Sequence, residues 1–348
     1  NAFTSQDYTG YVTTFAADRL DLMLKLEADR MTGLRLTPED IAPERRVVLE
    51  ERLSRIDNNP SAQLSEQAAA ALYANHPYRI PIIGWEHEIK NLNRADLMEF
   101  YRAWYTPNNA VIVISGDVTA ADVKPMVQRH FGALPSRDLP TRPDWKEPPR
   151  SADRMVSLSH PRVRQPSWSR RYLVPNYGAS DRQQKYALNV LTEILSGGTT
   201  GRFYRRLVVE QALAAHAGAW YSGDNRGPGV FGFYGSPRPG RTLDEIETAI
   251  EVEIAAVLEN GITDEEVKLA VERMQAEAVF ARDSLNAPPR ILGNALMSGQ
   301  SIEDVEAWPE RIGAVTKQAV DAAARAVLRT GGTVTTRLTP QSKPEKKS

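Results

Sequence analysis

The chain has 348 residues, which is enough for two domains of ordinary size, each with its own core. Lys and Arg total 43 against 44 for Asp and Glu, and the resulting net charge of −1 excludes the basic field that a nucleic-acid or anionic-membrane partner requires. The chain has no cysteine, which excludes disulfides, thiolate metal sites and cysteine nucleophiles and leaves the redox compartment undetermined.

The first predicted element is a strand within residues 1–15, a stretch rich in Thr, Tyr, Phe and Val that is typical of a strand near a sheet edge. The sequence begins with Asn1 rather than Met and shows no signal peptide, so we expect the natural protein to carry residues before it. A helix is predicted next, over residues 18–32, because apolar residues recur there at helical spacing. They are predicted to face the core: Leu20, Leu22, Met23, Leu26 and Met31.

A second helix is predicted to begin at Thr37, which supplies an N-cap and is followed by a proline and two acids. Seven helical steps of roughly 100° return to within about 20° of the starting direction, so the carboxylates of Glu44 and Glu51 should project from one face. By itself, this pattern is more typical of a solvated helix face than of a functional site. Two valines are predicted to pack inward and three arginines to stay in water: Val47 and Val48, and Arg45, Arg46 and Arg52.

Further helices are predicted over residues 62–73, 93–105 and 119–130. Residues 110–115 are predicted to form a buried strand, and because the longest apolar runs are of this size we expect no membrane-spanning segment. Residues 137–154 hold several prolines among charged residues. They can form neither a helix nor a central strand, so they are predicted to be an extended linker.

The sequence also contains an internal repeat. Residues 92–113 align with residues 315–336 without a gap, and residues 37–41 parallel residues 263–267. A second copy of one structural unit is the simplest account. Each copy is expected to mix antiparallel strands with helices packed on one face, which makes the predicted fold α+β with two homologous domains. The predicted boundaries are an N-terminal domain over 1–136, the linker 137–154, a C-terminal homologous domain over 155–340 and a solvated tail over 341–348.

Four segments occur in this order: NAFTSQDYTGY from Asn1, ERRVVLEE from Glu44, NHPYRIPIIGW from Asn75 and FYRAWYTPNNAVIVISGDV from Phe100. Together they resemble segments of the inverzincin metallopeptidases, the family of pitrilysin and insulin-degrading enzyme. The likeness continues through the C-terminal half, and it is closest to the mitochondrial processing peptidase type and its bacterial relatives. The resemblance implies one half of a clamshell that encloses a peptide substrate.

In this family one zinc ion is held by two histidines of a His-x-x-Glu-His motif, whose glutamate is the general base, and by a glutamate on a later helix. Motif alignment matches Glu51 to that metal ligand and Glu44 to the acid that supports it by hydrogen bonding. None of the five histidines stands in the motif's spacing. The resemblance therefore implies no catalytic base in this chain, which we expect upstream of Asn1, and it implies that the chain alone is inactive.

The resemblance also implies a substrate site and a partner. The opening strand resembles the family's edge strand, on which a peptide substrate pairs by β-augmentation, so the backbones of Asn1, Ala2 and Phe3 are candidate substrate contacts. Active single-chain members carry an arginine and a tyrosine in the second half, where this chain has Val208 and Ala215. This pattern indicates the zinc-bearing member of a heterodimer whose other subunit, of the same fold, contributes the missing pair.

Two functions stay open at this point. One is a subunit of a zinc-dependent endopeptidase. The other is a non-catalytic scaffold or assembly subunit of the same fold, like the core subunits of a respiratory complex. A His-x-x-Glu-His motif in the natural residues before Asn1 would favour the first function. The sequence does not fix the compartment, and we expect a soluble protein of a bacterial periplasm or cytoplasm.

Overall fold

The computed structural model describes residues 1–176, 182–329 and 331–341, and its fold is α+β. The chain divides into two compact units, each of which collects separate segments of the sequence. Unit 1 comprises residues 1–54, 82–144 and 281–297, and unit 2 comprises residues 55–81, 145–280 and 298–348.

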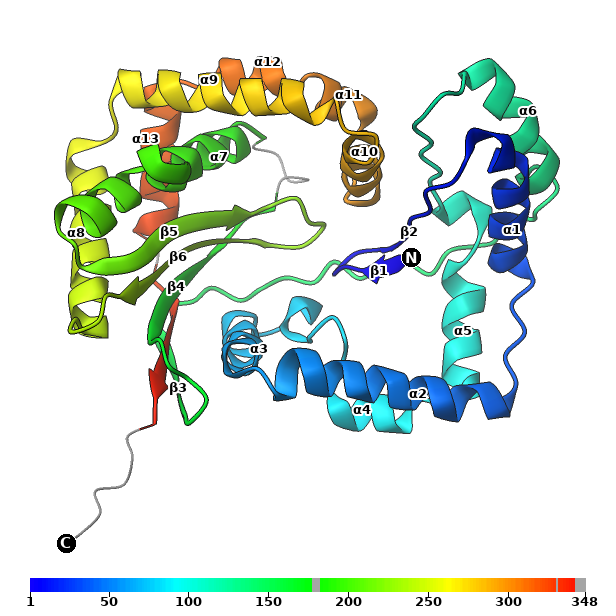
Figure 1. The fold of residues 1–348 in the computed structure, drawn as a ribbon, viewed down its shortest axis with the longest axis horizontal. Helices are drawn as coiled ribbons and strands as arrows, with labels where there is room; N and C mark the ends of the chain where they lie inside the picture. The colour runs from blue at the N-terminus through cyan, green and yellow to red at the C-terminus, as the bar shows by residue number, and fades with distance from the viewer. Residues whose placement is uncertain (177–181, 330, 342–348) are drawn as a thin grey trace, which may run out of the picture. The chain divides into compact units, whose positions relative to one another are not determined.

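Unit 1 is mainly helical, with one two-stranded antiparallel sheet (Figure 1). Helix α1 packs against α6, and α2 packs against α4. Its elements are β1 (Ala2–Thr4), β2 (Thr9–Tyr11), α1 (Leu20–Thr32), α2 (Pro38–Arg52), α4 (Glu86–Asn91), α5 (Arg94–Trp104), α6 (Ala120–Phe131) and α10 (Ala287–Met297).

The predicted helix starts in unit 1 are confirmed, because local capping signals define them. Thr37 caps α2, and its backbone N–H donates a hydrogen bond of 2.7 Å to the Asp40 carboxylate in a capping box. Asn93 and Asp96 form the same arrangement at the start of α5. These bonds satisfy N–H groups that have no partner within the helix.

The predicted inward face of α1 is partly wrong. Leu20 is buried as expected, but Leu22 and Leu26 are 48% and 50% exposed. The buried positions are Leu20, Leu24 and Ala28, which follow one another at intervals of four residues. The side of the helix that becomes buried is the side that packs on α6, and the apolar pattern alone does not specify it.

The buried strand predicted at residues 110–115 is also wrong. This stretch has no regular secondary structure, and Val111 and Ile112 are 43% and 44% exposed. A strand is stabilised by pairing with a neighbour. In the described part of the chain, no strand lies beside these residues.

Unit 2 contains a five-stranded sheet in the order β3-β7-β4-β6-β5. The β3–β7 pair is parallel and the other pairs are antiparallel, so the sheet is mixed rather than antiparallel as predicted. Nearly the whole of unit 2 separates β3 from β7 along the chain, which gives the long connection that parallel neighbours need. The strands are β3 (Arg154–His160), β4 (Ser167–Val174), β5 (Ala214–Ser222), β6 (Gly229–Pro237) and β7 (Val334–Pro340).

Helices cover both faces of this sheet, whereas the sequence predicted helices on one face (Figure 1). Trp168 and Tyr172 of β4 point into a large apolar core formed with α7, α8 and α13. Leu173, on the opposite face of the same strand, packs with α3 in a second, smaller cluster. The helices are α3 (Pro60–Leu72), α7 (Arg182–Ser196), α8 (Leu243–Asn260), α9 (Asp264–Ala281), α11 (Ile302–Glu306), α12 (Trp308–Gly313) and α13 (Lys317–Leu328), and a π-helix spans Tyr204–Glu210.

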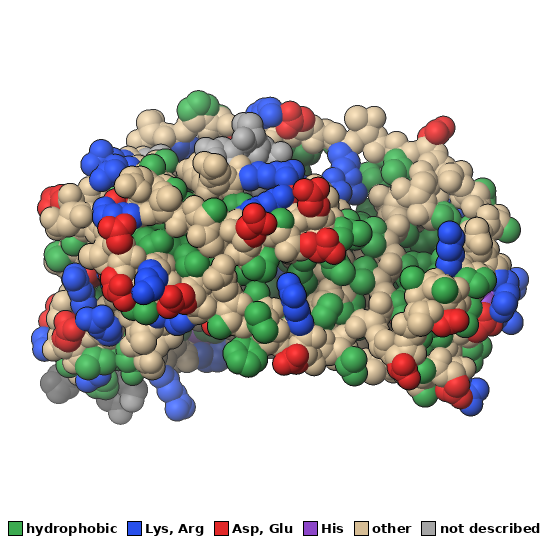
Figure 2. All heavy atoms as spheres, turned by 90° about the horizontal axis from the view of Figure 1, so that it is seen from above, with side chains coloured by type: hydrophobic (Ala, Val, Ile, Leu, Met, Phe, Trp, Pro, Cys, Tyr) green, Lys and Arg blue, Asp and Glu red, His purple; other side chains and the backbone are tan. Residues whose placement is uncertain are grey.

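The surface matches the balanced composition. Figure 2 shows Lys and Arg side chains interspersed with Asp and Glu side chains over the face that it displays, with hydrophobic side chains between them. None of the described helices combines the length and the apolar character that crossing a membrane requires.

Candidate functional site

Glu44 and Glu51 both lie on α2, within one uninterrupted α-helix. Their spacing of seven residues directs the two side chains to the same side of the helix. Glu44 is exposed and Glu51 is partly buried. Immediately after Arg52 the α-helix changes to a π-helix over Leu53–Asp57, a geometry that is frequent near functional sites.

The orientation of α2 differs from the sequence prediction. Val47 is 59% exposed, although it was predicted to pack inward, and Arg52 is only 5% exposed, although it was predicted to stay in water. The reason is that α2 packs against α4 on its arginine side, where the guanidinium of Arg52 donates a 2.9 Å hydrogen bond to the carbonyl oxygen of Gly84. Arg45 similarly donates to the carbonyl oxygen of Leu92 at 2.8 Å. Arginine contacts to backbone carbonyls therefore hold the helix that carries the two glutamates.

The predicted substrate strand forms β1 and pairs with β2 alone, so one of its edges has no neighbouring strand among the described residues. The backbones of Asn1 and Val12 exchange two hydrogen bonds of 2.8 Å. By the alternation of an antiparallel ladder, the N–H of Ala2 points toward the open edge, where it donates to the side-chain oxygen of Asn1 at 2.8 Å. A strand added at this edge would compete with the Asn1 side chain for that N–H.

Aromatic side chains anchor this hairpin within unit 1. The hydroxyls of Tyr11 and Tyr105 lie 2.6 Å apart, and the Arg30 guanidinium stacks 3.3 Å from the centroid of the Tyr11 ring. Burial raises the pKa of Tyr105, and the hydrogen bond with Tyr11 raises it further. The Tyr105 hydroxyl therefore stays protonated at neutral pH and serves as a hydrogen-bonding group. Direct packing does not bring α2 and β1 together, since β1 packs mainly on β2 and α2 mainly on α4.

The residues present do not fit a complete metal site. Among residues 1–176, 182–329 and 331–341, no three His, Asp or Glu side chains are grouped closely enough to hold a metal ion. A catalytic zinc takes about three protein ligands, so Glu51 alone falls short. His87 and its neighbours Glu86 and Glu88 are exposed on α4, and a hydrogen bond from Lys90 lowers the pKa of Glu86.

His76 is a structural residue of unit 2. It is 8% exposed, packs edge-on against Tyr78 with ring centroids 4.3 Å apart, and accepts the Tyr78 backbone N–H at its Nδ1 atom. Gly227 must be a glycine here, because a Cβ at that position would overlap the imidazole ring.

Sequence reasoning missed the role of Glu147, which lies in the stretch predicted to be a linker. Its carboxylate accepts the backbone N–H groups of Ala74 and Asn75, each at 2.8 Å, and that of His76. Burial alone would raise the pKa of Glu147, but these three N–H donors outweigh it and lower the pKa below its usual value. No periodic pattern marks this residue, so the sequence offered no signal for it.

The positions that replace the family's Arg/Tyr pair have different environments. Val208 lies in the π-helix of unit 2, is 7% exposed and belongs to the large apolar core. Ala215 is exposed at the irregularity of β5 between Ala214 and His216. The structure therefore brings no polar pair together at these two positions.

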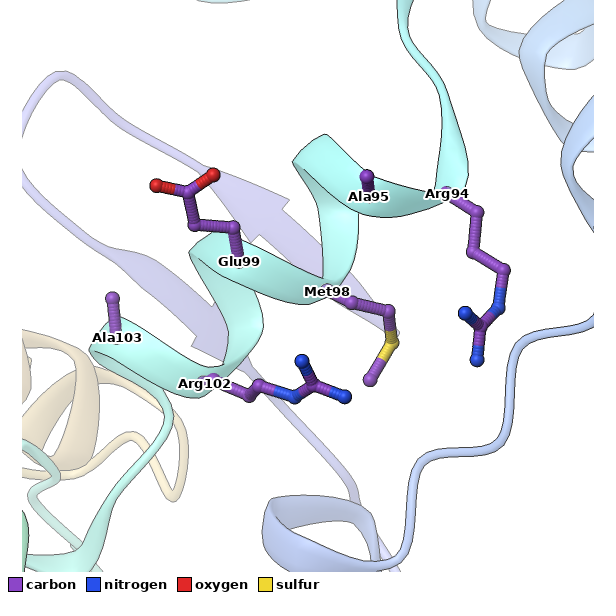
Figure 3. Close-up of a pocket in the computed structure, with 6 residues that line it drawn as sticks. All are labelled: Arg94, Ala95, Met98, Glu99, Arg102 and Ala103. Carbon is purple, nitrogen blue, oxygen red and sulfur yellow. The ribbon is translucent and has the colours of Figure 1, made fainter.

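A hollow of about 610 Å³ lies along α5 (Figure 3). Arg94, Met98 and Arg102 extend from one side of the helix, and the carboxylate of Glu99 extends from the other. The Nε of Arg94 donates to the carbonyl oxygen of Leu36 at 2.7 Å. With one carboxylate and no imidazole, this hollow supplies neither a metal donor set nor an acid–base pair.

Comparisons with known proteins cover most of the chain. Residues 1–86 match the family model described as "Insulinase (Peptidase family M16)", and residues 91–274 match the model described as "Peptidase M16 inactive domain". An uncharacterized zinc protease of Mycobacterium leprae is 27% identical over 342 residues, which cover 94% of this chain and 73% of that protein. The zinc protease PqqE of Helicobacter pylori is 31% identical over 262 residues, which cover 74% of this chain and 57% of that protein.

The fold also matches a solved structure over nearly the whole chain. The crystal structure of a protease from Helicobacter pylori superposes with a TM-score of 0.89 at 24% identity, over 98% of this chain and 82% of that one. The similarity thus extends over both units and agrees with the order of the four sequence segments. The chain belongs to the M16 peptidase family, the family of insulinase and pitrilysin.

Proposed function

We propose that this chain is the metal-bearing subunit of a zinc-dependent endopeptidase of the mitochondrial processing peptidase type. The observation that carries the proposal is the pair Glu44 and Glu51, which project from one side of α2 in the segment that matches the insulinase family model. Two relatives that are named as zinc proteases support this proposal.

Glu51 would supply one carboxylate to the zinc ion, and Glu44 would support it by hydrogen bonding. Two imidazole ligands and the general base would have to come from residues outside this sequence. When bound, such an ion supplies a Lewis acid for peptide hydrolysis. The contribution of this chain's own residues is to hold Glu51 in place, through the buried contact of the neighbouring Arg52 with Gly84.

The substrate would bind as an added strand at the open edge of β1, with backbone contacts from Asn1, Ala2 and Phe3. Binding would displace the Asn1 side chain from the Ala2 N–H and replace one hydrogen bond with another. Recognition through the backbone selects an extended peptide and tolerates varied side chains.

A homologous partner subunit would contribute the Arg/Tyr pair that Val208 and Ala215 replace. The two domains, 1–136 and 155–340 with the linker 137–154 between them, would be two copies of one unit. In support, α5 begins at Arg94 and α13 begins at Lys317, which are aligned positions of the repeat. In this arrangement, the exposed stretch that contains Val111 and Ile112 would be available to pair with further strands.

The second candidate function is a non-catalytic scaffold or assembly subunit of the same fold. One observation favours it: residues 91–274 match a model described as an inactive domain. In this case Glu44 and Glu51 would be ordinary surface acids of a helix.

The two functions are separated by measuring bound zinc and peptide cleavage in the natural protein with its own N-terminal residues. We expect about one zinc per chain, loss of zinc and activity in Glu51→Gln, and zinc affinity about 10–100-fold weaker in Glu44→Gln. Glu50→Gln, an exposed neighbour on the same helix, is the matched control and should behave as the wild type. A native chain that binds no zinc and cleaves no peptide would establish the scaffold function instead, whereas a Glu51→Gln variant that keeps its zinc would show that Glu51 is not a ligand.

A further inference from the structure

A small polar cavity lies within unit 2, between the first turns of α3 and the sheet. Its volume is about 140 Å³, several times the roughly 30 Å³ that one water occupies in the liquid. No acidic side chain lines it among the described residues, and its polar lining includes Ser65, Arg171, Ser169, Thr336, His216 and Tyr234.

Arg171 is the only charged group in this lining apart from the titratable His216. Its Nη2 donates to the Ser65 hydroxyl at 2.7 Å and its Nη1 donates to the Ser65 carbonyl oxygen at 3.4 Å. Its Nε–H is buried without an acceptor, and no carboxylate of the described residues forms an ion pair with it. Burial lowers the pKa of Arg171, and only the nearby Tyr73 hydroxyl opposes this effect.

The neighbouring Arg170, on the same strand, differs from Arg171 because it has carboxylate partners. It points to the opposite face of the sheet, where its Nη2 contacts Glu247 at 2.8 Å and Glu251 at 2.9 Å. A largely buried cation without such partners is costly unless an anion compensates it. The sheet face toward α3 therefore has an uncompensated positive charge that the other face lacks.

The same cavity is also lined by side-chain hydroxyls. The hydroxyls of Ser169 and Thr336 lie 2.7 Å apart and can rotate to donate to a guest. Asn59 already caps the first N–H groups of α3, so the free donors are those of side chains. His216 is exposed at the rim, so the cavity is accessible from solvent.

We propose that this cavity binds a small oxyanion, with the Arg171 guanidinium as the cation and serine and threonine hydroxyls as further donors. Inorganic phosphate and a short-chain carboxylate share the required chemistry, because both present several acceptor oxygens to a guanidinium. The bound anion would link β4 to α3 and stabilise unit 2, and this role is independent of zinc and of peptide cleavage.

The test compares phosphate, acetate and chloride at constant ionic strength and pH, by isothermal titration calorimetry and by the unfolding temperature of the full chain. We expect phosphate or acetate to bind and raise the unfolding temperature, and chloride to do neither. Whichever of phosphate and acetate binds more tightly shows whether the cavity takes inorganic phosphate or a short-chain carboxylate. Arg171→Gln should weaken binding at least tenfold, whereas Arg162→Gln, at an exposed arginine of the same unit, should bind as the wild type.

Arg171→Lys and Ser65→Ala are the second variants if Arg171→Gln does not fold. The lysine keeps the charge but loses the planar fork, and the alanine removes one hydroxyl, so both should bind more weakly than the wild type. Equal effects of all three salts, or undiminished binding by these variants, would show that the cavity holds only water and would overturn the proposal.

Discussion

The Nη1 atom of Arg52 lies 2.9 Å from the carbonyl oxygen of Gly84 and donates a hydrogen bond to it. Arg52 is 5% exposed, and Gly84 has a φ of +87°, a conformation that favours glycine and fixes the direction of its carbonyl. Arg52→Met should leave this carbonyl without its donor and lower the free energy of unfolding by about 1–3 kcal/mol. Urea denaturation measures the loss. Arg46→Met, at an exposed position of the same helix, should stay within about 0.5 kcal/mol of the wild type.

The hairpin depends on Gly10, because a Cβ at that position would overlap the Phe3 ring. Phe3 packs edge-on against Tyr8 with ring centroids 5.7 Å apart. Gly10→Ala should displace the ring and cost roughly 0.5–1.5 kcal/mol, the usual value of such an aromatic pair. In a double-mutant cycle with Phe3→Ala, the cost of Gly10→Ala should largely disappear. If it stays the same in the Phe3→Ala background, the ring is not the cause.

Glu266 predicts an acid-dependent loss of stability. It accepts two hydrogen bonds from Arg202, at 2.5 and 2.6 Å, and one from the Thr263 backbone N–H at 2.8 Å. Burial alone would raise its pKa, but these bonds lower the pKa of Glu266 from about 4.5 to about 2. Because the folded-state pKa is depressed, the stabilisation is fully present above the unfolded-state value near 4.5 and is lost as the pH falls toward 2.

The stability difference between the wild type and Glu266→Gln should therefore be largest at neutral pH and should shrink between about pH 4.5 and pH 2. Unfolding at a series of pH values measures it. Glu265→Gln, at the exposed preceding residue, is the matched control and should show little difference at any pH. A constant difference for Glu266→Gln across this range contradicts the assignment.

Asp304 links three helices of unit 2. The residue is 5% exposed. Its carboxylate contacts Arg182 at 2.5 Å and Arg311 at 2.6 Å, and it caps the Ser301 end of α11. Asp304→Ala should cost roughly 2–3 kcal/mol, less than the loss of one partner from a fully buried pair, because both arginines keep contact with water. Asp304→Asn should cost less, since its amide oxygen still accepts the Ser301 N–H. Chemical denaturation of both variants tests the order.

Local signals in the sequence were sufficient to locate the starts of α2 and α5 but not to orient the helices. The caps at Thr37 and Asn93 define where α2 and α5 begin, because they involve residues only three positions apart. The burial of Arg52 and the exposure of Val47 depend on α4, more than thirty residues later, and no local pattern encodes that contact.

The candidate site likewise has features that were predictable from the sequence and features that were not. The common direction of Glu44 and Glu51 follows from the helix period, so the sequence was sufficient to predict it. The binding of three backbone N–H groups by Glu147 was not predictable, because its partners lie some seventy residues upstream and a single acid among prolines resembles any solvated residue. The strand expected at 110–115 failed because β structure requires a neighbour that the residues themselves cannot specify.

The position of β7 has a consequence for how unit 2 is assembled during synthesis. β7 is the last strand of the sheet in the sequence, yet it lies between β3 and β4, and β3 has no other neighbour in that sheet. On the ribosome, β3 and β4 emerge early and must wait until residues 334–340 have left the exit tunnel before they become parts of the same sheet. Translation that stops short of Val334 would therefore release a polypeptide with two unpaired strand edges, the kind of surface that chaperones protect from aggregation.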